Sequence, residues 1–411
     1  MKSASPLLLL SMILSASSSC PDLEAQCEDI FRRVLAERVV LKGQRSLELL
    51  QSLLTYLLWH HHRYDPETQQ YFQFLQLALG MAADLGLYTR FKKPGGISVQ
   101  SAEDFNVVRT FLLCYYLSCG TGILGYDRPD SMQSIQELKH AAGLLAQGSK
   151  DVLDRQAPAM LALMHVLAQQ RDHLNRSGRT ESQSGSFSTA LESWEASQLS
   201  YESPPIVRCT YHFVYAYGLL KGSVPSSLTA RVYQTCLDHL VVVLSTILEQ
   251  DVSHLVLLGI AEWGHLLTTL FLLPRLETSL AATTSSHTSG HKDTPLTFHY
   301  IGRFRDALRE IKVKAQHNIV LGTHTFFGWL DKILSAVETQ TTSRVSSSSS
   351  AKADTREQGD TSAYELVNSF LDDQDGDVSG AEHLLAKNRA HNEGSNTEDF
   401  WVDFMSDWLN W

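Results

Sequence analysis

The 411-residue sequence has few cysteines and no motif built from paired cysteines. Its six cysteines are scattered, and no C-x-x-C pair occurs, which excludes a zinc ribbon or a dithiol redox site of the usual kind. Most of them lie in apolar stretches, so we expect buried, reduced thiols and a reducing compartment. The signatures of phosphate-binding P-loops, G-x-S-x-G hydrolases and H-E-x-x-H metalloproteases are missing as well. We therefore predict no catalytic residue, no cofactor and no metal.

Positive charge is also scarce, because 34 basic residues face 45 acidic ones and the formal net charge is -11. Twelve acids and two bases lie from Asp360 to the C-terminus, so this tail carries -10 and the first 359 residues carry -1. A nearly neutral body lacks the clustered Lys and Arg that bind nucleic acid. The closest candidate, Arg303 to Lys314, is interrupted by Asp306 and Glu310, and we interpret it as a solvated helix face with ion pairs.

No uninterrupted apolar run has the length of a membrane span. The best candidate, His254 to Leu273, contains Glu262 near its centre and His265 close by. A charge at the centre of a span is costly in lipid, so we predict a buried core helix and no contact with a membrane.

The N-terminus has two interpretations. Lys2, the apolar run from Leu7 to Leu14 and the small residues after it are typical of a signal peptide. The alternative is a core helix that begins at Ser5-Pro6, an N-cap followed by a first-turn proline. The few cysteines and a single sequon at Asn175 favour the core helix, and a secreted helical protein remains an alternative.

Helical periodicity dominates the chain. Two amphipathic helices are predicted at Arg45–Tyr64 and Pro66–Leu85, with Asp65 as the N-cap of the second and Gly86 at its end. Further helices are predicted at 22–41, 104–119, 134–146, 151–174, 190–199, 205–220, 226–250, 254–273, 296–314 and 318–339, and polar loops at 120–125, 177–188 and 285–294. No β pattern and no repeat is found. We expect an all-α fold, an irregular array of many helices.

The expected domain organisation follows from composition. Residues 1–340 form the helical body, residues 341–359 form a Ser-rich linker that cannot bury a core, and residues 360–411 form a flexible acidic tail.

The end of the tail carries the clearest signal for binding a partner. Rings fall on one helix face while acids line an adjacent edge, a pattern typical of activation segments. The alternative is a terminal helix that packs back onto the body. The predicted partner-binding residues are Asp399, Phe400, Trp401, Asp403, Phe404, Asp407, Trp408 and Trp411.

Two stretches suggest metal sites but lack the necessary ligands. His60-His61-His62 are consecutive, so on a helix they point about 100° apart and cannot face one ion. Asp373 to Asp377 begins like a calcium loop, but position twelve is Leu384 in place of the bidentate Glu.

Two other stretches resemble the middle regulatory region of fungal zinc binuclear cluster transcription factors. The first is Leu49–Leu87, and the second is Arg109–Pro129, R-T-F-L-L-C-Y-Y-L-S-C-G-T-G-I-L-G-Y-D-R-P. In the family, a helix with an arginine and paired aromatics leads to a Gly-Arg-Pro-like turn. The matching positions here are Arg109, Phe111, Tyr115, Tyr116, Arg128 and Pro129, although Tyr126-Asp127 interrupts the turn. The aromatic C-terminus also looks like members of this group.

The resemblance implies a nuclear regulator of transcription with an all-helical control domain. It implies that the tail binds the transcription machinery or a coactivator, and it suggests a small-molecule effector and control of a secondary-metabolite gene cluster. The family's zinc cluster is not matched, because Cys20 and Cys27 lack their partners, so DNA is expected to be contacted only indirectly or through a missing zinc cluster. An all-α enzyme or ligand-binding protein with a buried pocket is the alternative.

Overall fold

The computed structural model describes residues 5–17, 20–59, 70–92, 101–123, 132, 135–177, 181–200, 203–223, 228–284, 295–315 and 326–350. Within these ranges the chain forms sixteen α-helices, one π-helix and no strand, which confirms the all-α prediction. The helices are α1 (Pro6–Ala16), α2 (Pro21–Leu35), η1 (Ala36–Leu41), α3 (Leu47–Leu58), α4 (Tyr71–Asp84), α5 (Leu87–Arg90), α6 (Ala102–Ile123), α7 (Ile135–Gly148), α8 (Val152–Arg155), α9 (Ala157–Ser177), α10 (Glu181–Gln198), α11 (Pro205–Gly222), α12 (Ala230–Leu248), α13 (Val252–Val256), α14 (Ile260–Thr284), α15 (Leu296–Ala315) and α16 (Phe326–Ser350).

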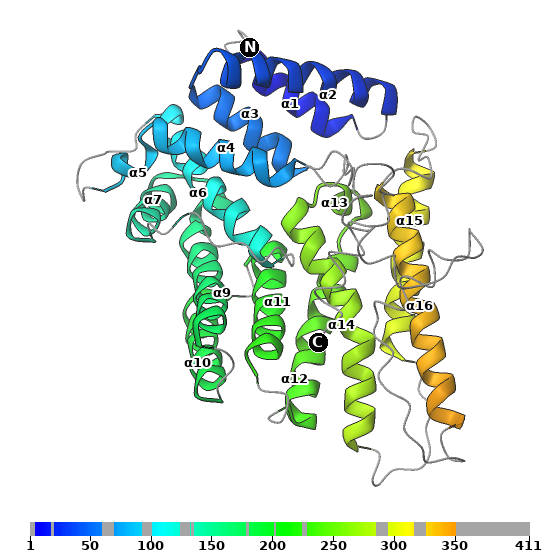
Figure 1. Ribbon diagram of the computed structural model, residues 1–411. Coiled ribbons are helices and arrows are strands. Elements are labelled where there is room, and N and C mark those ends of the chain that lie inside the picture. Colours follow the sequence, from blue (N-terminus) through cyan, green and yellow to red (C-terminus); the bar gives the residue numbers. More distant parts are fainter. Residues whose placement is uncertain are drawn as a thin grey trace, which may run out of the picture.

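The helices form a row that is covered at one end. In Figure 1, α9 to α12 and α14 to α16 run side by side, and α1 to α4 lie across their upper end. The packed neighbours along the row are α9 and α10, α10 and α11, α11 and α12, α12 and α14, α14 and α15, and α15 and α16. α6 lies below α3 and α4 and contacts both, and it also contacts α9 and α14. It therefore connects the covering layer to the row.

Two hydrophobic cores meet in α11. Val207, Phe213 and Val214 belong to the core of the N-terminal half, whereas Leu219 and Leu220 belong to the core formed with α12, α14, α15 and α16. One helix thus contributes side chains to both cores, and burial of this apolar surface holds the two halves together.

The N-terminal apolar run forms the helix α1, in agreement with the core-helix interpretation. Its side chains Leu7 and Leu14 are buried. The backbone amide of Leu7 donates a hydrogen bond to Oε1 of Glu48 at 3.0 Å, so an otherwise unpaired amide of the first turn is satisfied by α3.

The predicted helix pair differs from α3 and α4 at its inner ends. α3 begins at Leu47, where the Ser46 side chain accepts a hydrogen bond from the Leu49 amide. α4 begins at Tyr71 with Gln70 as its N-cap, so the prediction of a start at Pro66 is wrong, and Asp65-Pro66 itself lies outside the described residues. Gly86 has φ 69° and follows α4, as predicted, because this left-handed conformation suits glycine.

Two predicted loops are helical over the residues that the structure describes. The loop predicted at 120–125 is helix as far as Ile123, the end of α6. The polar loop predicted at 177–188 is largely the first half of α10. Phe187, Leu191 and Trp194 of α10 are spaced by four and three residues and are buried, so packing outweighs the poor helix propensity of the surrounding serines.

Two helices extend beyond their predicted ends. α14 continues past Pro274 to Thr284, and Leu276 is still buried beyond the proline. α16 continues to Ser350, through the first ten residues of the predicted linker, and Thr341 is buried within it. The rest of that linker and the predicted tail lie outside the described residues.

All six cysteines are free thiols. Five of them are buried, as predicted, and Cys20 is exposed.

Candidate functional site

The predicted family-motif residues that the structure describes all lie on α6. Arg109, Tyr115 and Tyr116 come from this one helix. Arg128 and Pro129 lie outside the described residues, as do the eight partner-binding residues predicted from Asp399 to Trp411. The candidate site is therefore built around α6 and the helix ends that meet it.

Arg109 fixes α6 to α8 through an ion pair of bidentate geometry. Its Nε lies 3.0 Å from Oδ1 of Asp154, and its Nη2 lies 2.6 Å from Oδ2. The Ser149 hydroxyl donates a further hydrogen bond to the same carboxylate. The hydrogen bond from Arg109 lowers the pKa of Asp154, and Ser149 adds to this effect, so the buried carboxylate stays charged. The arginine of the family motif is thus a structural anchor.

The paired tyrosines differ in their surroundings. Tyr115 is buried in the core of the N-terminal half. The Tyr116 hydroxyl donates a hydrogen bond to Oε1 of Glu262 at the start of α14. Burial raises the pKa of Tyr116 well above its usual value, and the neighbouring Glu262 raises it further. Tyr116 therefore remains a neutral donor.

The carboxylate of Glu262 is buried at the start of α14 and is held by hydrogen bonds. Burial raises its pKa, and the hydrogen bond from Tyr116 opposes that effect. Backbone hydrogen bonds from Glu262 and Gly259 oppose it as well. A buried acceptor that loses a partner costs about 1–3 kcal/mol, so the Tyr116 hydrogen bond is important for holding this carboxyl group in place.

Close packing of three helix ends brings Tyr116 and Glu262 together. A Cβ atom at Gly259 would lie 2.7 Å from Oε2 of Glu262 and 2.8 Å from Cδ1 of Leu58. A Cβ atom at Gly120 would lie 3.3 Å from that of Ala261. The end of α3, the end of α6 and the start of α14 thus meet at one junction.

Glycines 120, 122 and 125 have the spacing of a dinucleotide-binding loop. The first two of them belong to the helix α6, whereas a dinucleotide-binding loop follows a strand.

His265 lies one turn beyond Glu262 on α14 and is buried. Its ring stacks on Phe213 of α11, with centroids 4.1 Å apart. Burial lowers its pKa to about 3, so the imidazole is neutral at pH 7. Sequence reasoning used Glu262 and His265 only to argue against a membrane span. Two polar residues three positions apart inside an apolar helix lie on the same side of it, and this spacing was the signal that could have identified both as buried polar residues.

Two further histidines, His212 of α11 and His239 of α12, lie in contact, and the sequence analysis did not predict this pair. Nδ1 of His212 lies 2.9 Å from Nδ1 of His239, and the His239 ring stacks on Tyr215 with centroids 4.1 Å apart. Burial lowers the pKa of His212 to about 4, and His239 adds to this effect. The pKa of His239 is lowered by burial. One neutral ring donates to the other, and the pair packs α11 against α12.

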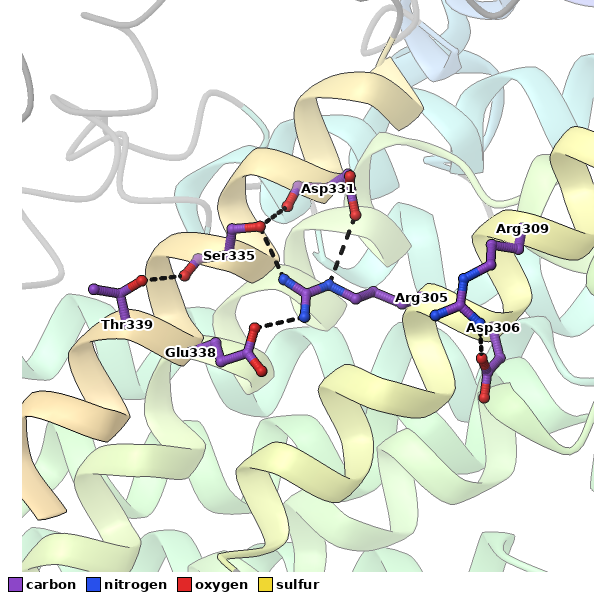
Figure 2. Close-up of polar contacts among 7 residues, drawn as sticks. All are labelled: Arg305, Asp306, Arg309, Asp331, Ser335, Glu338 and Thr339. Carbon is purple, nitrogen blue, oxygen red and sulfur yellow. Dashed lines mark hydrogen bonds and ion pairs between the residues drawn. The ribbon is translucent and has the colours of Figure 1, made fainter.

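Two arginines of the basic cluster of α15, Arg305 and Arg309, are paired with acids. Figure 2 shows the Arg305 guanidinium between Asp331, at 3.7 Å, and Glu338, with Ser335 as a further partner. Arg309 pairs with Asp306 on its own helix. The contacts of Arg305 fasten α15 to α16, and the charges of these two arginines are balanced by acids, which makes them poorly suited to bind phosphates.

Two further sequence predictions concern metals and membranes. Within the described ranges, no group of three or more His, Cys, Asp or Glu side chains could hold a metal ion. Both metal-like stretches, His60–His62 and Asp373–Asp377, lie outside those ranges. None of the helices that the structure describes has the length and apolar character needed to cross a membrane.

Comparison with known proteins gives one match. Residues 1–119 match the family model of the fungal specific transcription factor domain. No curated protein and no solved structure matches the chain. The matched stretch runs from α1 into α6 and includes Arg109, Tyr115 and Tyr116. Residues 1–119 of this chain are thus similar to the fungal specific transcription factor domain, which confirms the resemblance found in the sequence.

Proposed function

We propose that this chain is a fungal transcriptional regulator in which the helical body is the regulatory part and residues 360–411 are the activating part. The observation that carries the proposal is the family match over residues 1–119. That stretch is packed into a larger body, because Tyr116 of the matched part is hydrogen bonded to Glu262 far outside it. The matched part and the C-terminal helices therefore share the junction of α3, α6 and α14.

The partner of the activating part is a coactivator or another component of the transcription machinery. The proposed contact residues are the tail rings Phe400, Phe404, Trp408 and Trp411, with Asp399, Asp403 and Asp407 keeping them solvated. An amphipathic segment of this composition suits an apolar groove on a partner. The near-neutral body is a poor ligand for DNA, so we place DNA recognition in a zinc cluster or in a partner protein.

We also propose where this regulator acts and what it controls. The proposals are a nuclear location, activation rather than repression, a small-molecule effector and control of a secondary-metabolite gene cluster. Each derives from the family resemblance, and the proposal assigns no catalytic step to the chain.

The test is a transfer of activity. Residues 352–411 fused to an unrelated DNA-binding domain should activate a reporter gene. Replacing Phe400, Phe404 and Trp408 by Ala should abolish the signal, because the apolar contact face is lost. The matched control replaces Tyr364 and Phe370, two rings of the same tail outside the terminal segment, and should retain most of the signal. A reporter signal that the triple replacement leaves unchanged would refute the role of the tail.

A further inference from the structure

The first half of α14 carries its polar side chains on one face. Those with a carboxylate, an imidazole or a hydroxyl group between Ile260 and Leu273 are Glu262, His265, Thr268 and Thr269. At 100° per residue, the four positions fall within about 120° of the helix circumference. We call these four residues the polar face of α14.

This polar face is buried, although the polar face of an amphipathic helix usually meets solvent. All eight residues from Trp263 to Leu270 are buried, and eight consecutive residues cover every direction around a helix. α14 contacts α3, α6, α11, α12, α15 and α16, and Figure 1 shows it within the row of helices. His265 and Thr268 are only 4% and 2% exposed. The polar face of α14 is therefore turned toward other helices.

Two polar atoms of this face have no partner within the described part of the chain. They are Nε2 of His265 and Oγ1 of Thr268, and both are buried. The other two members are engaged, because the Glu262 carboxylate accepts a hydrogen bond from Tyr116 and the Thr269 hydroxyl donates one to the backbone carbonyl of His265. Leaving a buried polar atom unpaired is costly. Two such atoms on one face indicate a site for a molecule that supplies the missing hydrogen bonds.

One small group can reach both atoms. Residues three positions apart on a helix have Cβ atoms about 5–6 Å apart. A single oxygen that makes two hydrogen bonds of about 2.8 Å can span that distance. The threonine hydroxyl can donate or accept, and Nε2 of a neutral histidine does one or the other, depending on the tautomer. A hydroxyl group, which both donates and accepts, suits the two atoms together.

The neighbouring groups on α11 are aromatic. The His265 ring stacks on Phe213 with centroids 4.1 Å apart, and Phe213 stacks on Tyr217 with centroids 5.4 Å apart. Burial lowers the pKa of His265 to about 3, so its imidazole carries no charge at pH 7. A charged ligand would lose its hydration here, and His265 would offer it no opposite charge. The surroundings therefore favour an uncharged molecule.

We propose that the polar face of α14 binds a small uncharged molecule with a hydroxyl group on an apolar or aromatic skeleton. Its hydroxyl group bonds to Nε2 of His265 and to Oγ1 of Thr268, and its skeleton lies beside Phe213. Water offers the same hydroxyl chemistry. The aromatic neighbours favour a molecule with a skeleton, because burial of its apolar surface adds to the two hydrogen bonds.

Binding at this site goes beyond the proposed function and does not depend on it. The bound molecule would lie where α14 meets α11, one helical turn from the contact between Glu262 and Tyr116 of α6. A ligand that binds only the folded chain stabilises it by mass action. Occupancy of the site should therefore strengthen the packing of α14 on α11.

Binding of phenol to the full chain tests the site. Phenol carries a hydroxyl group on an aromatic ring, and toluene has a similar size without that group. Titration calorimetry should show one bound phenol per chain. Toluene should bind about tenfold or more weakly, because both hydrogen bonds are lost. Phenol should also raise the Tm of the chain.

A pair of threonine variants locates the binding. Thr268→Val removes the hydroxyl group, keeps the shape of the side chain and should weaken phenol binding about tenfold, because one of the two hydrogen bonds is lost. Without phenol, its Tm should equal or exceed that of the wild type, since this hydroxyl bonds to no described residue. The matched control is Thr269→Val, which removes a hydroxyl group bonded within the helix and should leave the affinity for phenol unchanged.

Three results would overturn the proposal. The first is that the chain binds no phenol, or binds phenol and toluene equally. The second is that Thr268→Val and Thr269→Val change the affinity for phenol by the same factor. The third is a Tm of Thr268→Val without phenol well below that of Thr269→Val, which would show that the Thr268 hydroxyl is already satisfied and would identify an ordered water as the occupant.

These results are separable from the test of the proposed function. Phenol binding as predicted, in a chain whose tail activates no reporter, would contradict the role in transcription and leave the site intact. A tail that activates a reporter, in a chain that binds no phenol, would overturn the site and leave the role in transcription intact.

Discussion

The hydroxyl of Tyr116 in α6 donates a hydrogen bond to the carboxylate of Glu262 in α14, 146 positions later in the sequence. Tyr116 lies inside the stretch matched by the family model, and Glu262 lies far beyond it. Around this contact, Gly120 packs on Ala261 and Gly259 packs on Leu58. The stretch that matches the family model and the C-terminal helices are thereby joined at a tight, buried junction.

We expect Tyr116→Phe to lower the free energy of unfolding by about 1–3 kcal/mol, because it removes a hydrogen bond and leaves the carboxyl group of Glu262 buried with one partner fewer. Denaturant titration measures the change. Tyr233→Phe is the control, since the Tyr233 hydroxyl makes no hydrogen bond within the described part of the chain, and it should change the value by about 0.5 kcal/mol or less. Equal effects of the two replacements would contradict the importance of the junction.

Gly259→Ala should destabilise the protein by about 1–3 kcal/mol, because its Cβ atom would press on Leu58 and on Oε2 of Glu262. The control is Gly302→Ala in the middle of α15, where a Cβ atom meets nothing within 4 Å. There we expect a gain of about 0.5–1 kcal/mol, because alanine favours the helix. Thermal or chemical unfolding of both variants measures whether the two changes in the free energy of unfolding have opposite signs. A stabilising Gly259→Ala would show that the helix ends are not tightly packed.

Arg109→Lys should cost about 1–2 kcal/mol, because lysine cannot reproduce the bidentate contact with the buried Asp154. Arg33→Lys changes an exposed pair with Asp29 and should cost about 0.5 kcal/mol or less. The pKa of Asp154 is lowered in the folded protein, so its pair stabilises the fold above the unfolded pKa and is lost as the pH falls through the folded pKa. Below the folded pKa of Asp154 the two variants should therefore differ less than at pH 7.

Stability should fall on acidification below about pH 6.5. The folded pKa values of His265 and His212, about 3 and about 4, lie below the unfolded value of about 6.5. Between these limits the unfolded chain binds protons that the folded chain does not, so stability is complete above pH 6.5 and is lost progressively down to pH 3.

His265→Leu isolates the effect of one group. It removes the titrating ring and keeps an apolar contact with Phe213, so the loss of stability between pH 7 and pH 5 should shrink by about 2 kcal/mol or less. Denaturant titrations at the two pH values measure this difference. A pH dependence identical to that of the wild type would show that His265 takes up its proton without unfolding.

The sequence predicted the helical class and the faces of many helices, because apolar residues at helical spacing identify the buried side of each element. Gly86 was correctly placed at the end of α4, since its left-handed conformation is a local requirement. Local sequence signals predicted helix ends wrongly where tertiary packing determines how far a helix extends. Pro274 predicts a helix end, yet α14 passes through it because Leu273 and Leu276 on either side are buried.

The contacts of the candidate site could be predicted only in part. The family motif identified Arg109 and Tyr116, but the spacing of residues in α6 contains no information on Asp154 or Glu262 as their partners. The same holds for His212 and His239, which are brought together by the packing of α11 on α12. Periodicity shows which side of a helix is buried, and only the fold shows which residue from another helix meets it.

Activation of a reporter by the full chain, fused to an unrelated DNA-binding domain, tests most directly whether this protein regulates transcription through its aromatic tail. The account predicts that the wild-type fusion activates and that replacing Phe400, Phe404 and Trp408 by Ala removes the signal at equal protein levels. A wild-type fusion no more active than the DNA-binding domain alone, or a triple variant as active as the wild type, would contradict it.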